Sequence, residues 1–550
     1  MHTFNSDLVG PTEIQTRFLF PFFFRRNHVR EVCAVLEQVT IVGKDNKSLV
    51  LWECSEPHDL YKEELLEHVV KMLFLSPEKA ECGYLKLSPS ISNMWFNKLE
   101  VVLPARRLQG KSSERRLPIR LLSERIELFF SKYGVGVLSV ALALDREPVS
   151  LDEALEFNYR LSQAREHTAA KLRTPHPSDN PEKWSALPEH IKAQVPEPPA
   201  TNAPLLEQLG RVGGEFTLFG LAHELLRPLE KLGFRSAQEE LSPYTVARFG
   251  EKVDLQNAEA CADMAAFLSA LAQVEEPGHA GAARGEIGVT NEMLNRRHWV
   301  GVGLLGAAHI VADQVPLSHP FNTARVPRVV LKYFIPYLLA LLQRLTLHRI
   351  IDEASILVMS KEDDAGRALS DLRNHLLEFA LVGHFTEVST REALHRYYRM
   401  CQQGLDVRNA LSDARQAIAD LDARHSAENQ AQIAQETSRS VAATRDLQQD
   451  MAKNVEATRK LHEQMAQHLD VVARVQLMVE WLEVFVVSVA AADLWHLFSY
   501  ENKGWFPTWA AKFFRDRDSF VSWGVVLAAL FAGAITLSFI QPWRHRKHGS

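Results

Sequence analysis

Residues 521–540 read VSWGVVLAALFAGAITLSFI, twenty consecutive residues without a charged side chain. As a helix this segment is about 30 Å long, which is the hydrocarbon thickness of a lipid bilayer. A tryptophan and then a run of basic residues follow it, and both are typical of a membrane boundary on the cytoplasmic side. The sequence therefore predicts a transmembrane helix over 521–542 and a basic cytoplasmic tail over 543–550. A buried helix of a soluble protein is the alternative.

A second apolar segment, residues 477–500, precedes the first one and carries ionisable residues. Glu480 and Glu483 lie near its start and Asp493 lies near its end. A carboxylate inside a membrane helix costs about 2.5–3.5 kcal/mol on insertion scales, so these side chains should face protein or water. We expect residues 477–500 to form another transmembrane helix, joined to the last one by an outer loop.

A seven-residue repeat runs through the chain before and within this segment. One position of the repeat holds Met451, Thr458, Met465, Val472, Val479, Val486 and Asp493, and the other holds Leu447, Asn454, Leu461, His468, Val475, Leu482, Val489 and His496. A coiled coil that serves only stability fills both positions with apolar residues. Repeated polar residues instead favour a water-filled axis between several helices. The predicted pore-lining residues are Asn454, His468, Val486, Val489, Asp493 and His496.

The same pattern has a second interpretation. A coiled-coil stalk of low stability also tolerates polar residues at single core positions, where they fix the register of the helices. In that case Asp493 would form a hydrogen bond with a neighbouring helix and no pore would exist. Both interpretations predict an oligomer.

Length and composition limit the remaining choices. A chain of 550 residues exceeds the usual size of one hydrophobic core, so two or three domains are expected. The net charge of −6 gives no electrostatic basis for direct binding of nucleic acid. Five widely spaced cysteines indicate reduced thiols in a cytosolic region. The run FLFPFFF at residues 18–24 is too short for a secretory signal and is expected to be a buried strand.

These observations give a predicted domain order. Residues 1–170 read as an N-terminal α/β cytoplasmic region with a hairpin turn at Gly134, a helix over 60–75 and a capping box at Ser150. Eight prolines mark a linker over 171–204. A second α/β cytoplasmic segment over 205–327 follows.

From residue 328 the chain is predicted to be helical, with a helical bundle and a long stalk helix over 328–476. The apolar stretch 329–347 contains Lys332, Pro336 and Arg344 and is expected to be a buried helix rather than a membrane span. Another capping box is predicted at Ser389. No glycine or proline occurs between residues 405 and 503, so one helix of roughly 150 Å is expected.

Two features of the second α/β segment bear on ligand binding. Residues 301–306 match G-x-G-x-x-G, but no acidic residue stands about twenty positions further on, so close packing is the preferred interpretation. Guanidinium groups bind phosphate well. The candidate phosphate ligands are Arg296, Arg297, Arg325 and Arg328. A solvated or ion-paired basic surface is the alternative.

Motifs of common enzyme families are not found in the chain. The sequence contains no HExxH, GxSxG, Walker A, CxxC or aspartate-rich metal motif. We therefore predict that the protein is not an enzyme and has no resident cofactor. An enzyme built around the glycine-rich run at 301–306 stays as a third hypothesis, which nucleotide turnover would revive.

The chain resembles the CorA family of divalent-cation channels from about residue 330 to its C-terminus. The resemblance rests on the architecture and on YFIPYLLALLQRLTLHRI at 333–350, FTEVS at 385–389 and EWLEVFVVSVAAADL at 480–494. It implies an α/β cytoplasmic domain, a long all-α stalk and two transmembrane helices, with five subunits whose first span lines the pore. CorA transporters end that span with Gly-Met-Asn, which occurs nowhere in this chain.

The resemblance extends to a divergent branch that includes members found beside type III CRISPR systems. It implies a homo-oligomeric channel in the bacterial inner membrane, with both termini in the cytoplasm. A divalent cation would be the transported ion, and a nucleotide second messenger would gate the pore in antiviral defence. The rival hypothesis is a non-conducting signalling or scaffold protein that the coiled coil merely oligomerises.

Overall fold

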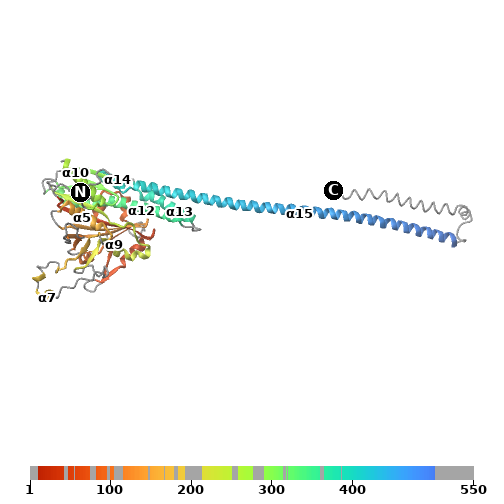
Figure 1. Ribbon diagram of the computed structural model, residues 1–550, viewed down its shortest axis with the longest axis horizontal. Helices are drawn as coiled ribbons and strands as arrows, with labels where there is room; N and C mark the ends of the chain where they lie inside the picture. The colour runs from red at the N-terminus through yellow and green to blue at the C-terminus, as the bar shows by residue number, and fades with distance from the viewer. Residues whose placement is uncertain are drawn as a thin grey trace, which may run out of the picture. The chain divides into compact units, whose positions relative to one another are not determined.

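The computed structural model describes most of the chain between residues 10 and 501 (Figure 1). The described residues are 10–42, 48–54, 56–74, 82–95, 99–103, 115–145, 149–165, 168–176, 178, 184–186, 188–192, 213–250, 258–276, 290–295, 297–313, 318, 320–359, 365–385 and 387–501. The chain divides into two compact units, Met1–Ala427 and Glu428–Ser550, which are treated separately below. The predicted outer loop, the second predicted span and the basic tail lie outside the described residues.

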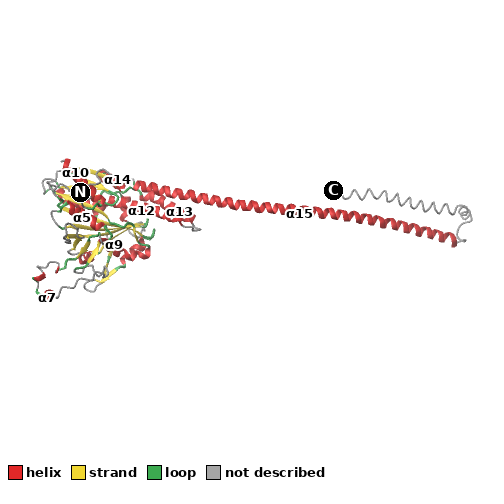
Figure 2. Ribbon diagram, in the orientation of Figure 1, coloured by secondary structure: helices red, strands yellow, loops and turns green. Residues whose placement is uncertain are grey.

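A sheet of 13 described strands forms the centre of the first unit (Figure 2). Its main path runs β10–β9–β6–β7–β8–β1–β12–β15–β14–β13, with β4, β5 and β11 attached, and β2 and β3 form a separate hairpin. The strands are β1 (Glu13–Phe23), β2 (Thr40–Val42), β3 (Ser48–Val50), β4 (Trp52–Cys54), β5 (Cys82–Leu87), β6 (Leu99–Leu103), β7 (Arg115–Ser131), β8 (Val135–Leu144), β9 (Lys171–Arg173), β10 (Glu215–Thr217), β11 (Arg235–Ser236), β12 (Ser242–Phe249), β13 (Thr290–Asn295), β14 (His298–Val302) and β15 (Ala307–Ala312).

The two predicted α/β segments contribute to this one sheet. Strand β1 pairs with β8 on one side and with β12 on the other, so residues 1–170 and 205–327 are joined by main-chain hydrogen bonds. The first residues of the predicted proline-rich linker form β9, which pairs with β6 and β10. Strands β12 and β15 pair in parallel, whereas the other described pairs are antiparallel.

Strand β1 contains most of the phenylalanine-rich run and confirms its prediction as a buried strand. Phe18, Phe20 and Phe22 belong to the core on one face of the sheet. Leu19 and Phe23 belong to the core on the other face, because successive side chains of a strand point to opposite sides. A strand that is buried on both faces reads as a continuous apolar run, which is why no polar alternation marks it.

Helices cover both faces of the sheet. The core that contains Phe18 also takes residues from α1, α4, α5, α9 and α10, whereas the core that contains Leu19 takes residues from α2, α3, α11, α12, α13, α14 and the start of α15. The helices are α1 (Val29–Glu37), α2 (Asp59–Lys62), α3 (Glu67–Phe74), α4 (Pro89–Trp95), α5 (Leu151–Ser162), α7 (Glu189–Lys192), α9 (Leu218–Leu226), η3 (Arg227–Leu232), α10 (Ala258–Gln273), α11 (Pro320–Lys332), α12 (Phe334–Met359), α13 (Ala365–Glu378), the π-helical turn η4 (Phe379–Gly383), α14 (Glu392–Gly404) and α15 (Val407–Glu501).

A buried ion pair links the sheet to its helices. Arg17 Nη1 donates to Glu127 Oε2 at 2.7 Å, and the hydroxyls of Tyr61 and Tyr84 each donate to the same carboxylate at 2.6 Å. The Arg17 guanidinium also lies 4.4 Å from the ring centre of Phe334 on α12. Burial by itself would raise the pKa of Glu127, but Arg17 and the two hydroxyls lower it below its usual value.

The predicted helix over residues 60–75 is interrupted in the structure. It forms α2 and α3 instead, because the chain turns at Glu64, which has a positive φ of 64°. Leu65 forms a β-bridge with Ser389, and the Ser389 hydroxyl donates to the Glu64 carbonyl at 2.5 Å. The interruption of this helix therefore depends on a contact with the distant residue Ser389. The local spacing of apolar residues could not predict that contact.

Two predicted capping boxes have different outcomes. At the start of α5, Ser150 Oγ accepts from the Glu153 amide and Glu153 Oε2 accepts from the Ser150 amide, so this box is confirmed. The box predicted at Ser389 is wrong. Helix α14 begins at Glu392 after Arg391, which makes no capping side-chain bond. The Ser389 hydroxyl lies before the helix, where it donates to the Glu64 carbonyl and accepts from the Arg391 amide at 3.0 Å instead of from the Glu392 amide.

The apolar stretch 329–347 is buried and helical as predicted, but it is divided at Tyr333 between the end of α11 and α12. The candidate span that contains it, Val326–Val358, is 83% buried within its most apolar window, as expected for a core helix. The helix packs on α13 and α14 and against the sheet through the core that contains Leu19. Length and hydropathy alone pass this helix as a membrane span, and its burial argues against that interpretation.

Helix α15 confirms the prediction of one long helix. It comprises 95 residues without interruption, about 140 Å at the standard rise. Its most apolar window lies within the candidate span Val407–Leu494 and is 0% buried. The fold class is thus confirmed in its coarse form, an α/β sheet domain followed by a long C-terminal helix.

Candidate functional site

The apolar side chains of α15 in the second unit have no protein cover within the described chain. Met451 is 68% exposed and Val489 is 45% exposed, and the apolar residues of the repeat between them are exposed as well. Contiguous exposed apolar surface of this kind marks a contact with protein or membrane. This stripe is the strongest candidate functional feature of the second unit, and we call it the seam.

The seam carries polar residues at several positions of the repeat. Asn454, His468 and Asp493 are all exposed along it. The hydroxyls of Thr437, Thr444 and Thr458 donate to the carbonyls four residues earlier in their own helix, at 2.7–2.8 Å. These threonine hydroxyls therefore already have an acceptor within their own helix. Asn454 and Asp493, in contrast, expose their amide and carboxylate groups. The polar character of the seam rests mainly on Asn454, His468 and Asp493.

Apolar residues also flank the seam on both sides. The flanking exposed residues are Val455, Leu469, Val471, Met478 and Phe485. A two-stranded coiled coil buries a narrow stripe, whereas a wider apolar face contacts more than one neighbouring helix. The width of this face favours an assembly of several helices over a dimer.

The face opposite the seam changes chemistry along the helix. At one position of the repeat, Glu456, Glu463 and Asp470 are followed by Leu477, Val484 and Ala491. The acidic members form ion pairs within the helix, with Lys460 for Glu456, Arg459 for Glu463 and Arg474 for Asp470. At this position of the repeat the side chains thus change from acidic to apolar between residues 470 and 477, and Glu480 and Glu483 are charged residues that still follow the change. This transition is expected where a helix passes from water into lipid.

The predicted pore-lining residues fall at the two positions of the repeat that form the seam. Asn454 and His468 lie where the outer face is charged, and Val486, Val489 and Asp493 lie where it is apolar. His496 lies within α15, but its side chain is outside the described set. One chain cannot close a ring from one helix face, so the pore assignment requires further copies.

The predicted phosphate ligands come from two separate elements. Arg297 precedes β14 and its Nη1 donates to the Asp313 carbonyl, so this guanidinium already has a protein partner. Arg328 is exposed on α11. Arg296 and the side chain of Arg325 fall outside the described part of the chain. The described residues give this set no common geometry.

The glycine-rich run forms a turn between antiparallel strands. Gly301 and Val302 end β14, and residues 303–306 connect it to β15; the Gly303 amide donates to the Gly306 carbonyl at 2.9 Å. A Cβ on Gly306 would lie 2.6 Å from the Pro243 carbonyl oxygen, and one on Gly301 would lie 2.7 Å from Asn291 Oδ1. A dinucleotide site needs this run to lead into a helix. The predicted close packing is therefore confirmed.

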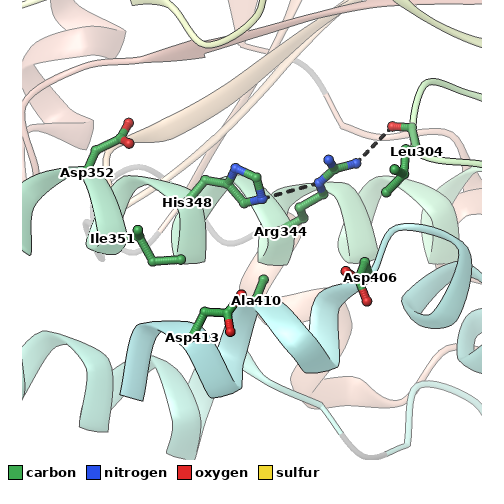
Figure 3. Close-up of a pocket in the computed structure, with 8 residues that line it drawn as sticks. All are labelled: Leu304, Arg344, His348, Ile351, Asp352, Asp406, Ala410 and Asp413. Atoms are coloured by element: carbon green, nitrogen blue, oxygen red, sulfur yellow. Dashed lines mark hydrogen bonds between the residues drawn. The ribbon is translucent and has the colours of Figure 1, made fainter. Parts of the chain in front are cut away.

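A polar cavity of about 310 Å³ lies where α12 meets the start of α15 (Figure 3). It is lined by Leu304 of the β14–β15 turn, Arg344, His348, Ile351 and Asp352 of α12, and Asp406, Ala410 and Asp413 at the start of α15. A second cavity of about 260 Å³ shares Arg344, His348 and Asp352 with the first. All of these residues belong to the first unit.

Arg344 is the central group of this cavity. Its Nη1 donates to the Leu304 carbonyl at 2.9 Å, and its Nε lies 3.5 Å from His348 Nε2. Burial lowers the pKa of Arg344, and burial together with the Arg344 charge lowers the pKa of His348. Among the described residues, no carboxylate lies within ion-pair distance of Arg344.

Sequence inspection missed this cavity. From the sequence alone, Arg344 is only a polar exception within an apolar helix, and the start of α15 is predicted to belong to the stalk. Arg344, His348 and Asp352 follow one another at intervals of four residues, which places them on one face of α12. That spacing was the available signal, but its partners on α15 could be found only from the fold.

Buried histidines form a separate polar chain. His298 Nε2 lies 2.9 Å from His309 Nδ1, and His309 Nε2 lies 3.1 Å from the Tyr397 hydroxyl. Burial lowers the pKa of His309 to about 3, so this ring is neutral at pH 7. None of the three lines the cavities described above. Within the described residues, no group of three or more His, Cys, Asp or Glu could hold a metal ion.

Comparison with protein-family models, curated proteins and solved structures gave no match for this chain. Function is therefore inferred from the geometry of α15 and of the first unit.

Proposed function

We propose that the protein is a homo-oligomeric, CorA-like channel of the bacterial inner membrane, with α15 as the pore helix. The observation that carries this proposal is the continuous seam of α15, exposed in the single chain and interrupted by Asn454, His468 and Asp493. Copies of the chain would cover the apolar seam residues and would bring the polar ones together in rings around one axis.

The membrane assignment is supported by the outer face of the same helix. Its change from Asp470 to Leu477 supports a water–lipid boundary in this part of the helix. Trp481 lies one turn further along, as expected for an interfacial aromatic residue. In this arrangement the first unit lies in the cytoplasm and the apolar part of α15 forms the first of two spans.

A conducting axis accounts for the seam better than an inert stalk. Asp493 would lie deep in an apolar part of the helix, where an unpaired carboxylate is costly in lipid. Facing a water-filled axis removes that cost, and a ring of carboxylates attracts cations. On this basis the channel conducts cations, its narrow ring contains Asp493 and His496, and the pentameric state is adopted from the CorA architecture. A nucleotide would gate it from the cytoplasmic side.

The experiment is ion flux into liposomes that contain the purified full-length protein, with and without candidate nucleotides. We expect cation flux in the wild type, a nucleotide-dependent change in its rate, and at least tenfold lower flux for Asp493→Ala. Asp450→Ala is the matched control, because this exposed carboxylate lies on α15 outside the predicted span. Flux that is unchanged in Asp493→Ala would remove this residue from the ring.

The second candidate function is a membrane-anchored scaffold without a pore, and the same exposed seam supports its oligomerisation. The two functions differ in how they respond to apolar substitutions. Replacing Asn454 and His468 by Leu should stabilise a stalk and preserve the scaffold, whereas it should reduce flux through a channel. Vesicles that remain impermeable under every ligand would favour the scaffold.

A further inference from the structure

The cavity between α12 and α15 separates two kinds of charge. Figure 3 shows Arg344 and His348 on α12, across from Ala410 and Asp413 on α15. The carboxylates of Asp352 and Asp413 make no hydrogen bond or ion pair with any described residue, and the Asp406 carboxylate accepts from the Asn409 side chain. One wall therefore offers a guanidinium and the rim offers carboxylates, without direct pairing between them.

Such an arrangement is unfavourable while the cavity holds only water. The Arg344 guanidinium is half-buried and has a carbonyl and an imidazole as its neighbours, but no counter-ion. An oxyanion in the cavity would supply charge-assisted hydrogen bonds to the guanidinium fork, which are about twice as strong as neutral ones. Burial lowers the pKa of Arg344, and the nearby Tyr337 and Asp406 only partly oppose this effect.

The carboxylates of Asp352, Asp406 and Asp413 in the lining favour hydrogen-bond donors instead of an oxyanion. Three carboxylates can accept hydrogen bonds from amines or hydroxyls, and they would repel an anion that brings no such donors. A bare metal ion does not fit either, because the described residues contain no cluster of metal ligands. The cavity thus selects for a molecule with an oxyanion at one end and hydrogen-bond donors at the other.

Size narrows the class further. A volume of about 310 Å³ lies at the lower end of the range of about 300–1,000 Å³ for ligand sites. Leu304, Ile351 and Ala410 contribute apolar side chains to the lining. We propose that this cavity binds a small ligand, of the type of a nucleoside monophosphate or an α-amino acid, with its oxyanion on Arg344 and its donors on Asp406 and Asp413.

Such a ligand would act on α15. It would bridge α12 to the first two turns of that helix, because Asp406 precedes α15 by one residue and Asp413 lies within it. If the proposed channel function holds, this site is where a cytoplasmic ligand controls the pore helix. The binding itself does not depend on conduction, so it can be tested separately.

The test is isothermal titration calorimetry of the full-length protein in detergent, with AMP, adenosine, L-leucine and inorganic phosphate as probes. We expect either AMP or L-leucine to bind, and the one that binds identifies the source of the oxyanion. Adenosine or phosphate alone should bind at least tenfold more weakly than AMP, because each engages only one end of the cavity. Absence of binding by both AMP and L-leucine would overturn the proposal.

Variants locate the binding. Arg344→Gln should weaken it at least tenfold, and Asp413→Asn should weaken it several-fold. Arg408→Gln is the control, because Arg408 is exposed on the first turn of α15 but does not line the cavity. Since Arg344 also bonds to the Leu304 carbonyl, Asp413→Asn provides a second variant in which this bond is kept.

Equal affinities in all three variants would place any binding elsewhere and overturn the assignment. Hydrogen exchange gives an independent readout, since the bound ligand should slow amide exchange over residues 407–415 in the wild type and leave it unchanged in Arg344→Gln. Ion flux is measured separately. Binding without any ligand effect on flux would contradict the channel proposal and leave the site intact, whereas flux without binding would contradict the site alone.

Discussion

The sheet domain buries its apolar side chains, whereas the part of α15 in the second unit exposes them. In the domain, Phe18 is 1% exposed and belongs to a core that helices cover, whereas Met451 on α15 is 68% exposed. The domain therefore satisfies its hydrophobic surface within one chain. The seam of α15 does not, and a single helix gains little stability in water without packing. The domain can be understood from one chain, but α15 only from an assembly or a membrane.

The largest effect on stability is expected from loss of the buried ion pair in the sheet domain. Glu127→Ala leaves Arg17 as a buried charge without its carboxylate and also removes the acceptor of two tyrosine hydroxyls. Loss of one partner of a buried ion pair costs about 3–5 kcal/mol in the free energy of unfolding. Denaturant unfolding, followed by the fluorescence of the domain, measures this change. A loss below about 1 kcal/mol would mean that the pair is not buried as described.

A second prediction uses pH. Burial lowers the pKa of His309 to about 3 in the folded state, so the unfolded chain binds more protons between that value and about 6.5. Stability should therefore fall as the pH is lowered through this range, by about 1 kcal/mol from pH 7 to pH 5.5 for this residue. Urea unfolding at both pH values measures the loss. His309→Gln should reduce this pH dependence, and an unchanged dependence would contradict the assignment.

The helix cap of α5 gives a smaller effect. Ser150→Ala removes the hydroxyl that accepts from the Glu153 amide and should lower the free energy of unfolding by about 1 kcal/mol. Ser150→Asp keeps an acceptor at this position and should restore most of the stability. If Ser150→Asp were as unstable as Ser150→Ala, the Ser150 hydroxyl would not stabilise α5 by accepting a hydrogen bond at its N-terminus.

The smallest effect is expected on the outer face of α15. Lys460→Ala removes an exposed ion pair with Glu456, and such pairs contribute about 0.3–0.5 kcal/mol. We expect no change in thermal unfolding beyond that amount and no change in assembly by native mass spectrometry. Dissociation of the assembly in this variant would mean that the charged face, rather than the seam, holds the subunits together.

Features that depend on local chemistry could be predicted from the sequence. The absence of glycine and proline predicted α15, the apolar run predicted β1, and the spacing of Ser150 and Glu153 predicted a capping box that the structure contains. In each case the cause and its effect lie within one segment of the chain.

Features that depend on distant contacts could not be predicted. Ser389 fits a capping pattern, but its hydroxyl bonds to Glu64, and this contact also interrupts the helix predicted over 60–75. The cavity around Arg344 requires α12 and α15 to lie side by side, which no local pattern states. The pore residues were identified as a helical stripe, and whether they form rings depends on the assembly.

Cross-linking tests most directly whether copies of the chain contact one another along the seam. Leu461→Cys places a thiol on the seam and Glu463→Cys places one on the outer face, both in a chain with Cys54 and Cys261 changed to serine. A short bis-maleimide should convert the Leu461→Cys protein in membranes to covalent dimers, and should leave the Glu463→Cys protein largely monomeric. Efficient cross-linking of Glu463→Cys with none at Leu461→Cys would contradict this account.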